Sequence, residues 1–288
     1  MMASLKAKSA SLDDSFFPAL GYLVGLKSGN ALPILTGLED YDPSFEDLKA
    51  FSAAFGTSGS SAMFHIAGVT PEAQRLDDAV IKDTSLMDTV VLSEKDLIDA
   101  WTALDSGRSD GDIVELVALG NPHLSLEECK SLAGICCDSP GGKKHPDIRI
   151  AATMGRSVHS EASLAGYINT LEDFGVEFIT DTCWCMLTEP VVPVKSTSIL
   201  TNSAKYAHYA PGLVRKKVRY HNMKGCIETA RTGKVPPPPN WVAFHSYSTI
   251  ANATVQSTYT HASQTPYTRL GAGRLARALR TAARFWTR

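Results

Sequence analysis

From residue 113 onward, short apolar runs alternate with amphipathic stretches, and each apolar run ends in a polar break. The runs are apolar throughout rather than alternating, which is typical of strands buried on both faces of a parallel sheet. Helical spacing of apolar positions follows most of them. We predict strands at 113–119, 148–152, 176–180, 198–200 and 218–220, with helices from Ser125, from Ser160 to Leu171, from Ala204 to Tyr209 and over 223–231.

The first third of the chain has a less regular pattern. Residues 16–26 mix Gly and Pro with apolar residues, which fits either a short helix or a buried connection. Ser44 and Ser93 are each followed by acidic residues and helical apolar spacing, and so predict two helix starts. Residues 61–67 and 90–92 read as strands. Strands that alternate with helices predict an α/β fold built on a parallel sheet covered on both faces.

Composition narrows the class of protein. The 288 residues are 44% hydrophobic and 20% charged, with a net charge of -2, so neither nucleic acid nor an anionic membrane is an expected partner. No apolar run approaches the roughly 18 residues that span a bilayer. The six cysteines are spread irregularly over a long chain, unlike a secreted disulfide framework. We therefore expect a reducing, cytoplasmic setting.

Both ends differ from the middle. Residues 1–14 are small, polar and unpatterned, so we predict a disordered N-terminus before a domain over 15–235. Pro236 to Pro239 form a rigid stop, and residues 241–288 contain six Arg but no Asp, Glu or Lys. We predict that 236–288 is this proline-rich stop and a basic, disordered tail. An amphipathic helix that contacts a membrane or partner, or a reading-frame artefact, are the other interpretations.

Polar motifs follow four of the predicted strands. In a parallel sheet these strand ends share one edge, where ligands bind. The motifs offer amide, imidazole, guanidinium, carboxylate, thiol and ammonium groups, which suit a small anionic substrate. They are Asn121-Pro122-His123, Thr153-Met154-Gly155-Arg156-Ser157, Asp181-Thr182-Cys183 and Asn202-Ser203-Ala204-Lys205.

Three of these motifs also have a plainer, structural interpretation. Asn121-Pro122-His123 fits turn chemistry, and Arg156 fits a solvated surface position. The thiol of Cys183 fits a metal ligand, a nucleophile paired with His123, or a buried small side chain. Lys205, just beyond a strand among small residues, is the stronger functional candidate.

Familiar cofactor motifs are missing from the sequence. There is no GxxxxGK[ST] and no GxGxxG after a strand, which argues against a phosphate cradle. Cys136-Cys137 and Cys183-x-Cys185 lack zinc-finger spacing.

Five stretches nevertheless resemble a known family. They are ALGYLVGL, FHIAGVTPEA, VELVALGNPHLSLEE, FITDTCW and TNSAKYAHYAPGL. Residues of roughly 15–240 resemble the later part of the aconitase X catalytic region, also called the phosphomevalonate dehydratase large-subunit-like domain. The resemblance implies the α/β/α layers of the aconitase superfamily.

The resemblance also implies an activity and a set of site residues. Family members are hydro-lyases that take water from cis-3-hydroxy-L-proline or mevalonate 5-phosphate, and they use an iron or iron–sulfur centre beside a small swivelling domain. It implies that Cys183 is a metal ligand and that Asn202, Ser203 and Lys205 face the substrate cleft. We therefore expect Lys205 and Ser203 to be catalytic. We expect Asn121, His123, Arg156, Ser157 and Asn202 to bind the substrate.

The chain departs from the family pattern at two points. Many members have Cys where this chain has Asn121. The first half of the family's large region and the swivelling domain are not evident, so the fold looks truncated. The chain is then expected to be a fragment, half of a split enzyme that needs those parts as partners, or a non-catalytic remnant. Asn121 and the proline-rich end favour cis-3-hydroxy-L-proline over mevalonate 5-phosphate.

Overall fold

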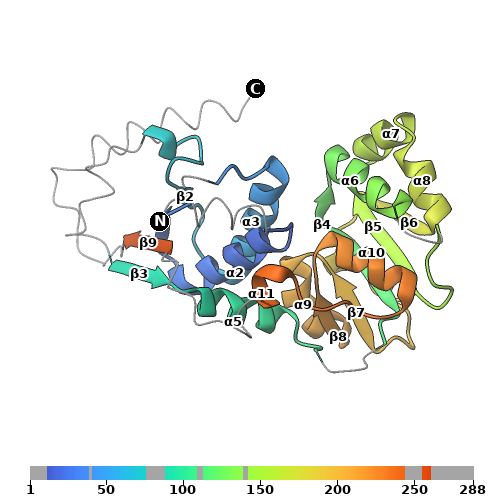
Figure 1. Ribbon diagram of the computed structural model, residues 1–288. Coiled ribbons are helices and arrows are strands. Elements are labelled where there is room, and N and C mark those ends of the chain that lie inside the picture. The colour runs from blue at the N-terminus through green and yellow to red at the C-terminus, as the bar shows by residue number, and fades with distance from the viewer. Residues whose placement is uncertain are drawn as a thin grey trace.

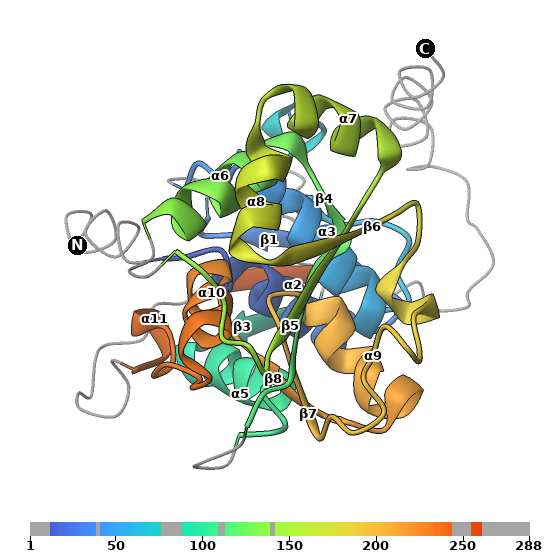
Figure 2. The ribbon, with the colours of Figure 1, turned by 90° about the vertical axis from the view of Figure 1, so that its right-hand side faces the viewer.

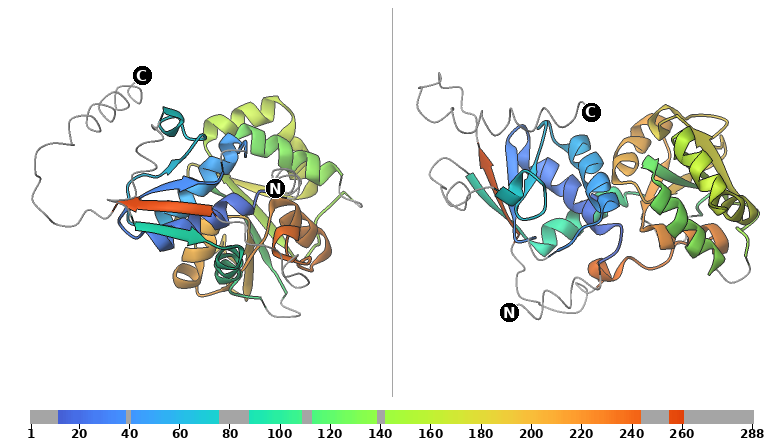
Figure 3. Two further views of the ribbon diagram at one scale, coloured as in Figure 1. Left: turned by 60° about the vertical axis from the view of Figure 1, so that its left-hand side comes forward. Right: turned by 90° about the horizontal axis from the view of Figure 1, so that it is seen from above.

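The computed structural model describes residues 12–38, 41–75, 88–108, 113–138 and 142–243, together with the backbone of 255–260. Elements from the first 104 residues gather on one side of the molecule, and those between residues 116 and 232 form a second body beside them (Figure 1, Figure 3). Most of the predicted tail, and residues 1–11, lie outside the described residues.

The second body is built on a five-stranded parallel sheet. Its strands are β4 (Leu116–Leu124), β5 (Arg149–Met154), β6 (Val176–Thr180), β7 (Ser198–Thr201) and β8 (Lys217–Tyr220). They lie in the order β6-β5-β4-β7-β8, and every neighbouring pair is parallel. The chain therefore moves outward in one direction from β4 to β6 and in the other from β7 to β8. The boundary between β4 and β7 is the topological switch point, where open α/β sheets bind their ligands.

Helices cover both faces of this sheet, which confirms the α/β prediction (Figure 2). One face packs on α6 (Leu126–Cys137), α7 (Arg156–Leu164), α8 (Tyr167–Phe174) and α10 (Met223–Thr232). The other packs on α2 (Phe16–Ser28), α5 (Glu94–Leu104) and α9 (Ala204–Val214). Along β4, Val117 and Leu119 belong to the first core, whereas Leu116 and Ala118 belong to the second. Because alternate side chains enter two cores, the strand has to be apolar throughout.

The predicted strands in the first third belong to a separate, mixed sheet. It contains β1 (Leu32–Thr36), β2 (His65–Ile66), β3 (Asp88–Leu92) and β9 (Val255–Thr260), in the order β2-β1-β9-β3. β9 runs antiparallel to both β1 and β3. β9 and the short helix α11 (Asn240–Ala243) fall within the range predicted as proline-rich stop and tail. The domain boundaries themselves stay a prediction.

Three helices begin with the capping boxes that the sequence indicates. The side chains of Ser44, Ser93 and Ser125 accept the backbone N–H three residues on, and the acidic side chain there accepts the serine N–H in return. They start α3 (Phe45–Ser58), α5 and α6. Each box satisfies two backbone donors that a helix end otherwise leaves open.

Two helix predictions were wrong in detail. The helix after β7 was expected to end at Tyr209, before Pro211, but α9 continues to Val214. Proline removes one hydrogen bond, and burial of the inner face through Ala207 and Ala210 keeps the segment helical. The helix expected from Ser160 to Leu171 is divided into α7 and α8, because Gly166 adopts a φ of +82° between them.

Residues near the start of the described chain form hydrogen bonds with residues of the segment 222–241. Asp13 accepts hydrogen bonds from the Asn222 amide at 2.6 Å and from the Trp241 indole N–H at 3.3 Å. Asp14 accepts the N–H of Met223 at 2.8 Å, at the start of α10. These two aspartates lie within the N-terminus predicted to be disordered. Within the described part of the chain, no helix is both long and apolar enough to cross a membrane.

Helices α2 and α3 approach each other closely at two glycines. A Cβ added to Gly21 would lie 2.4 Å from the carbonyl oxygen of Phe51, and one added to Gly25 would lie 2.7 Å from that of Phe55. These distances are well inside van der Waals contact. The crossing therefore requires glycine at both positions of α2.

We predict that Gly21→Ala lowers the free energy of unfolding by about 2 kcal/mol or more, because the added methyl forces the two backbones apart. Urea unfolding of the full chain measures it. Gly56→Ala in α3 is the matched control, since an added Cβ there meets nothing within 4 Å. The control should be neutral or gain up to roughly 1 kcal/mol of stability. Equal effects of the two substitutions would refute the close-packing account.

Candidate functional site

The candidate site lies where β4 and β7 end, at the switch point of the sheet. Gly120 adopts a φ of +85° near the end of β4, and a Cβ there would lie 2.2 Å from the carbonyl oxygen of Thr153. The Thr153 hydroxyl donates to the Gly120 carbonyl at 2.5 Å. Only glycine permits this contact. The tight approach of β4 to β5 fixes where Asn121, the next residue, lies.

Asn121 connects three segments that are distant in the sequence. It is only 5% exposed. Its backbone carbonyl accepts the hydroxyl of Ser203 from the end of β7. Its side-chain amide donates to Cys185 Sγ at 3.7 Å, and its Oδ1 accepts from Cys183 Sγ at 3.9 Å. One amide thus holds both thiols of the Cys183-x-Cys185 motif.

The position of Cys185 is set by a turn rather than by a strand. The strand stops at Thr180, and the chain then forms a single 3₁₀ turn, η3 (Trp184–Met186). Trp184 fastens this turn, because its indole N–H donates to the Leu119 carbonyl at 2.6 Å. The turn brings both thiols to the same amide. The rotation from a strand to a 3₁₀ helix has no clear signal in the sequence.

The surroundings of the two thiols are partly apolar. Burial raises the pKa of Cys185, and the neighbouring Cys183 adds to the rise. The hydrogen bond from Asn121 and the positive charge of Lys205 act in the opposite direction. Lys205 therefore lies near enough to act on this thiol electrostatically, which joins the β7 end to the cysteine turn.

The segment after β7 forms the start of helix α9. Ser203 is its N-cap, and the hydroxyl accepts the N–H of Tyr206 at 3.0 Å while donating to the Asn121 carbonyl. Both bonds position the helix start against β4. An exposed helix start attracts anions, because its first N–H groups are unpaired and its dipole is positive there.

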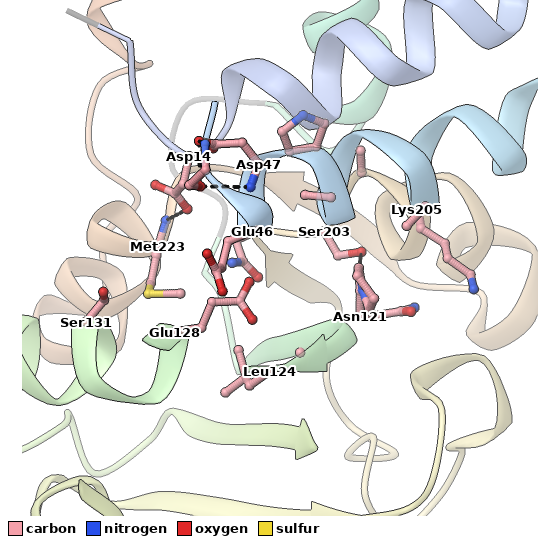
Figure 4. Close-up of a pocket in the computed structure, with 18 of the residues that line it drawn as sticks. Asp14, Glu46, Asp47, Asn121, Leu124, Glu128, Ser131, Ser203, Lys205 and Met223 are labelled. Atoms are coloured by element: carbon pink, nitrogen blue, oxygen red, sulfur yellow. Dashed lines mark hydrogen bonds between the residues drawn. The ribbon is translucent and has the colours of Figure 1, made fainter. Parts of the chain in front are cut away.

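A cavity of about 340 Å³ opens beside this helix start. Asn121, Asn202, Ser203 and Lys205 line it, so four of the eight predicted site residues share one pocket. In Figure 4, Asn121 and Lys205 lie at one end, and acidic side chains from α3 and α6 lie at the other. The cationic end suits a carboxylate group of a small ligand.

The acidic end of the pocket also holds α3 against α6. Lys49 forms an ion pair with Glu128 and donates to the His123 carbonyl at 2.9 Å. The hydroxyl of Ser125 donates to Glu46 at 2.9 Å. The sequence analysis missed these residues, since nothing in their spacing shows that two helix starts meet. They connect the first part of the chain to the pocket.

His123 lies beside the pocket rather than in its lining. Its Nε2 lies 3.0 Å from the carbonyl oxygen of Thr182, which orients the ring toward the Asp181-Thr182-Cys183 turn. The imidazole is therefore engaged with a backbone carbonyl. This geometry offers no support for a Cys183–His123 nucleophilic pair.

Arg156 and Ser157 occupy a more peripheral position. Both start α7 and are exposed, and Arg156 is 82% exposed in its side chain. The backbone N–H of Arg156 donates to Asp181 at 3.0 Å, and its side chain forms an ion pair with the same carboxylate; both lower the pKa of Asp181. The described pocket does not include either residue. Their predicted role in substrate binding stays a prediction.

The site fits iron in the chemistry of its donors but not in their number. Cys183 and Cys185 offer two thiols at one amide, and thiolates are common iron ligands. Among the described residues, no group of three or more His, Cys, Asp or Glu side chains could hold a metal ion. The described residues therefore do not offer a complete ligand set for iron.

Comparison with known proteins agrees with the resemblance seen in the sequence. Residues 2–102 match the family model for the aconitase X second domain, and residues 114–232 match that for the aconitase X third domain. Both parts of this chain belong to the aconitase X family. A structure of aconitase X from Thermococcus kodakaraensis, in its holo-form, superposes with a TM-score of 0.62 at 28% identity. The match covers 76% of this chain and 52% of that one, and confirms the superfamily fold.

The similar aconitase X proteins include two kinds of dehydratase. The chain is 45% identical over 234 residues to a cis-3-hydroxy-L-proline dehydratase of Pseudomonas aeruginosa and 44% over 226 residues to one of Hypocrea jecorina. It is 31% identical over 229 residues to the phosphomevalonate dehydratase large subunit of Methanosarcina mazei. These matches cover 81%, 78% and 78% of this chain, but 39%, 37% and 50% of the relatives. The chain thus spans half or less of their length.

We predict that Trp184→Phe lowers the free energy of unfolding by roughly 2–4 kcal/mol, because it leaves a cavity and an unpaired carbonyl at Leu119. Urea unfolding measures the loss. Iodoacetamide should also label Cys185 faster in this variant, as the turn loosens. Met186→Ala, in the same turn but 77% exposed, is the control and should change stability by less than about 0.5 kcal/mol. An unaltered labelling rate in Trp184→Phe would contradict the anchoring role.

Proposed function

We propose that this chain forms part of the catalytic unit of a hydro-lyase that removes water from cis-3-hydroxy-L-proline. The observation that carries the proposal is the pocket at the switch point, which Lys205, the start of α9 and Asn121 line. The thiols of Cys183 and Cys185 are outside this lining, and both bond to the side-chain amide of Asn121. The identity of 45% and 44% to cis-3-hydroxy-L-proline dehydratases, against 31% to a phosphomevalonate dehydratase subunit, supports this substrate over mevalonate 5-phosphate.

Dehydration of a hydroxy acid breaks a C–H bond beside the carboxylate and a C–O bond on the next carbon. Negative charge develops on the carboxylate side as the proton leaves. Lys205 would hold the carboxylate and stabilise that charge, together with the N–H groups at the start of α9. Asn202 and Asn121 supply amide groups for orientation. Ser203 holds the helix start to β4 through the hydrogen bond of its hydroxyl group to the Asn121 carbonyl. In its predicted catalytic role, this hydroxyl would therefore act from a fixed position.

Cys183, with Cys185 beside it, would hold the iron or iron–sulfur group that the family implies. When bound, such a group acts as a Lewis acid toward the leaving hydroxyl. Asn121 orients both sulfurs, and Trp184 holds the turn that carries them. Two thiols do not complete the set, so the proposal requires further ligands from outside the described residues.

The proposed partners correspond to the parts of the relatives that this chain does not cover. The matched models are those of a second and a third domain, and one group of relatives consists of large subunits. We propose that the upstream part and a small swivelling domain or subunit complete the site, in the same or a separate polypeptide. The six cysteines are all free, which supports a reducing, cytoplasmic location.

A domain-exchange experiment tests the activity. The corresponding 234-residue stretch of the Pseudomonas aeruginosa dehydratase is replaced by that of this chain, and loss of water is followed by mass spectrometry with each substrate. We expect turnover of cis-3-hydroxy-L-proline and none of mevalonate 5-phosphate. A folded chimera inactive on both would favour a non-catalytic remnant. Turnover of mevalonate 5-phosphate alone would reverse the choice of substrate.

Within the active chimera, we predict that Lys205→Met lowers kcat/KM by roughly 10- to 100-fold, because a charge-assisted hydrogen bond to the carboxylate is lost. Lys216→Met is the matched control. Lys216 donates to the Val194 carbonyl at 2.8 Å in the loop after α9, away from the pocket lining, and its loss should leave kcat/KM unchanged. A Lys205→Met variant as active as the control would remove Lys205 from the mechanism.

A further inference from the structure

The pocket beside the start of α9 carries opposite charges at its two ends. Lys205 and Asn121 lie at one end, and carboxylates from α3 and α6 lie at the other (Figure 4). Within the acidic part, Glu46 and Glu128 lie between Asp14 and Asn121, on the side that faces the cationic end. A pocket of this kind suits a molecule that carries both a negative and a positive group.

Several of the carboxylates in this lining are already matched by groups of the protein. Glu128 forms an ion pair with Lys49, and Glu127 forms one with Lys130 at 2.9 Å. Asp47 closes the capping box at the start of α3. Because these three carboxylates are already paired or bonded, they have little charge to offer to a ligand.

Glu46 differs from these carboxylates in its hydrogen bonding. It is half-buried, and one of its carboxylate oxygens accepts the hydroxyl of Ser125 at 2.9 Å. Within the described ranges of the chain, no cation forms an ion pair with Glu46 and no donor bonds to its second oxygen. Asp14 also lines the pocket, but it accepts the N–H of Met223 and lies beyond Glu46 as seen from the cationic end (Figure 4). Glu46 therefore offers an unmatched oxygen and its negative charge to a ligand.

The chemistry of the proposed substrate matches this pair of charges. In cis-3-hydroxy-L-proline the ring nitrogen is a secondary ammonium group at neutral pH, and it is bonded to the same carbon as the carboxylate. Mevalonate 5-phosphate carries a carboxylate and a phosphate but no cation. An unmatched carboxylate in the pocket attracts the first molecule and repels the phosphate of the second. The ammonium group also makes the neighbouring C–H more acidic, so an anion that keeps the nitrogen protonated favours departure of that proton.

We propose that Glu46 binds the ring ammonium group of the substrate while Lys205 binds its carboxylate, and that Glu46 thereby selects an amino acid over a phosphorylated hydroxy acid. The inference rests on the proposed function and names the residue that determines the substrate class. Glu46 lies in the part of the chain that matches the second domain of the family, and Lys205 lies in the part that matches the third. Each of the two domains would then contribute one charge to the pocket.

The test compares the binding of two small ligands to the full chain by NMR titration. L-Proline and (S)-tetrahydrofuran-2-carboxylate share the ring and the carboxylate, but the second has a ring oxygen in place of the ammonium group. We expect the unmodified chain to bind L-proline about 10-fold more tightly, because only L-proline forms a charge-assisted hydrogen bond with Glu46. Glu46→Gln keeps an oxygen acceptor for Ser125 and should bind the two ligands about equally. Glu161→Gln, at an exposed position of α7 outside the pocket lining, is the matched control and should keep the 10-fold preference.

Two outcomes of the titration would contradict the role of Glu46 and leave the proposed function standing. One is a preference for L-proline that persists in Glu46→Gln, and the other is equal or weaker binding of L-proline by the unmodified chain. If the unmodified chain bound neither ligand, the pocket would not be a substrate site, and both proposals would fail.

Turnover gives a second measurement, in an active chimera whose exchanged stretch includes Glu46. There we expect Glu46→Gln to lower kcat/KM for cis-3-hydroxy-L-proline by roughly 10- to 100-fold, and Glu161→Gln to leave it unchanged. A Glu46→Gln chimera as active as this control would refute the inference alone, because the activity itself would still be present. An unmodified chimera inactive on cis-3-hydroxy-L-proline would refute the proposed function, and the inference with it.

Discussion

The arrangement of the site depends on how Asn121 is held. Gly120 takes a backbone conformation that suits glycine, presses against Thr153, and delivers Asn121 to the point where β4 leaves the sheet. There its carbonyl fixes the start of α9, and its amide fixes both thiols. A buried amide needs hydrogen-bond partners, and both polar atoms of the Asn121 side chain have one.

The residues around Asn121 are held firmly because they pack into a core to which both the first and the second body contribute side chains. Trp184 and Tyr206 belong to the core that α2, α3 and α5 also fill. Asp105, at the end of α5, is 2% exposed and pairs with Arg219 of β8 at 2.7 Å. A buried ion pair of this kind is costly to break, so it fixes α5 relative to the sheet. Polar groups at the switch point can therefore be held in place before any ligand arrives.

The sequence predicts the strand ends well, because burial on both faces demands continuous apolar runs that stop at the sheet edge. The polar motif in the last residues of β4, and those after β5, β6 and β7, could be identified in this way, and so could the capping serines. It does not predict that Arg156 stays outside the pocket, that Cys185 returns to the amide of Asn121, or that Lys49 reaches across to His123. Those outcomes depend on turn geometry and on contacts between residues 25 or more positions apart.

The central claim is that a small hydroxy acid binds where β4 and β7 end. Hydrogen–deuterium exchange of the full chain, with and without saturating cis-3-hydroxy-L-proline, tests it most directly. The account predicts slower exchange in residues 119–124 and 201–206. It predicts no change at the opposite edge of the sheet, around Lys144 to Arg149. Protection confined to that opposite edge, or no protection in either strand end, would contradict it.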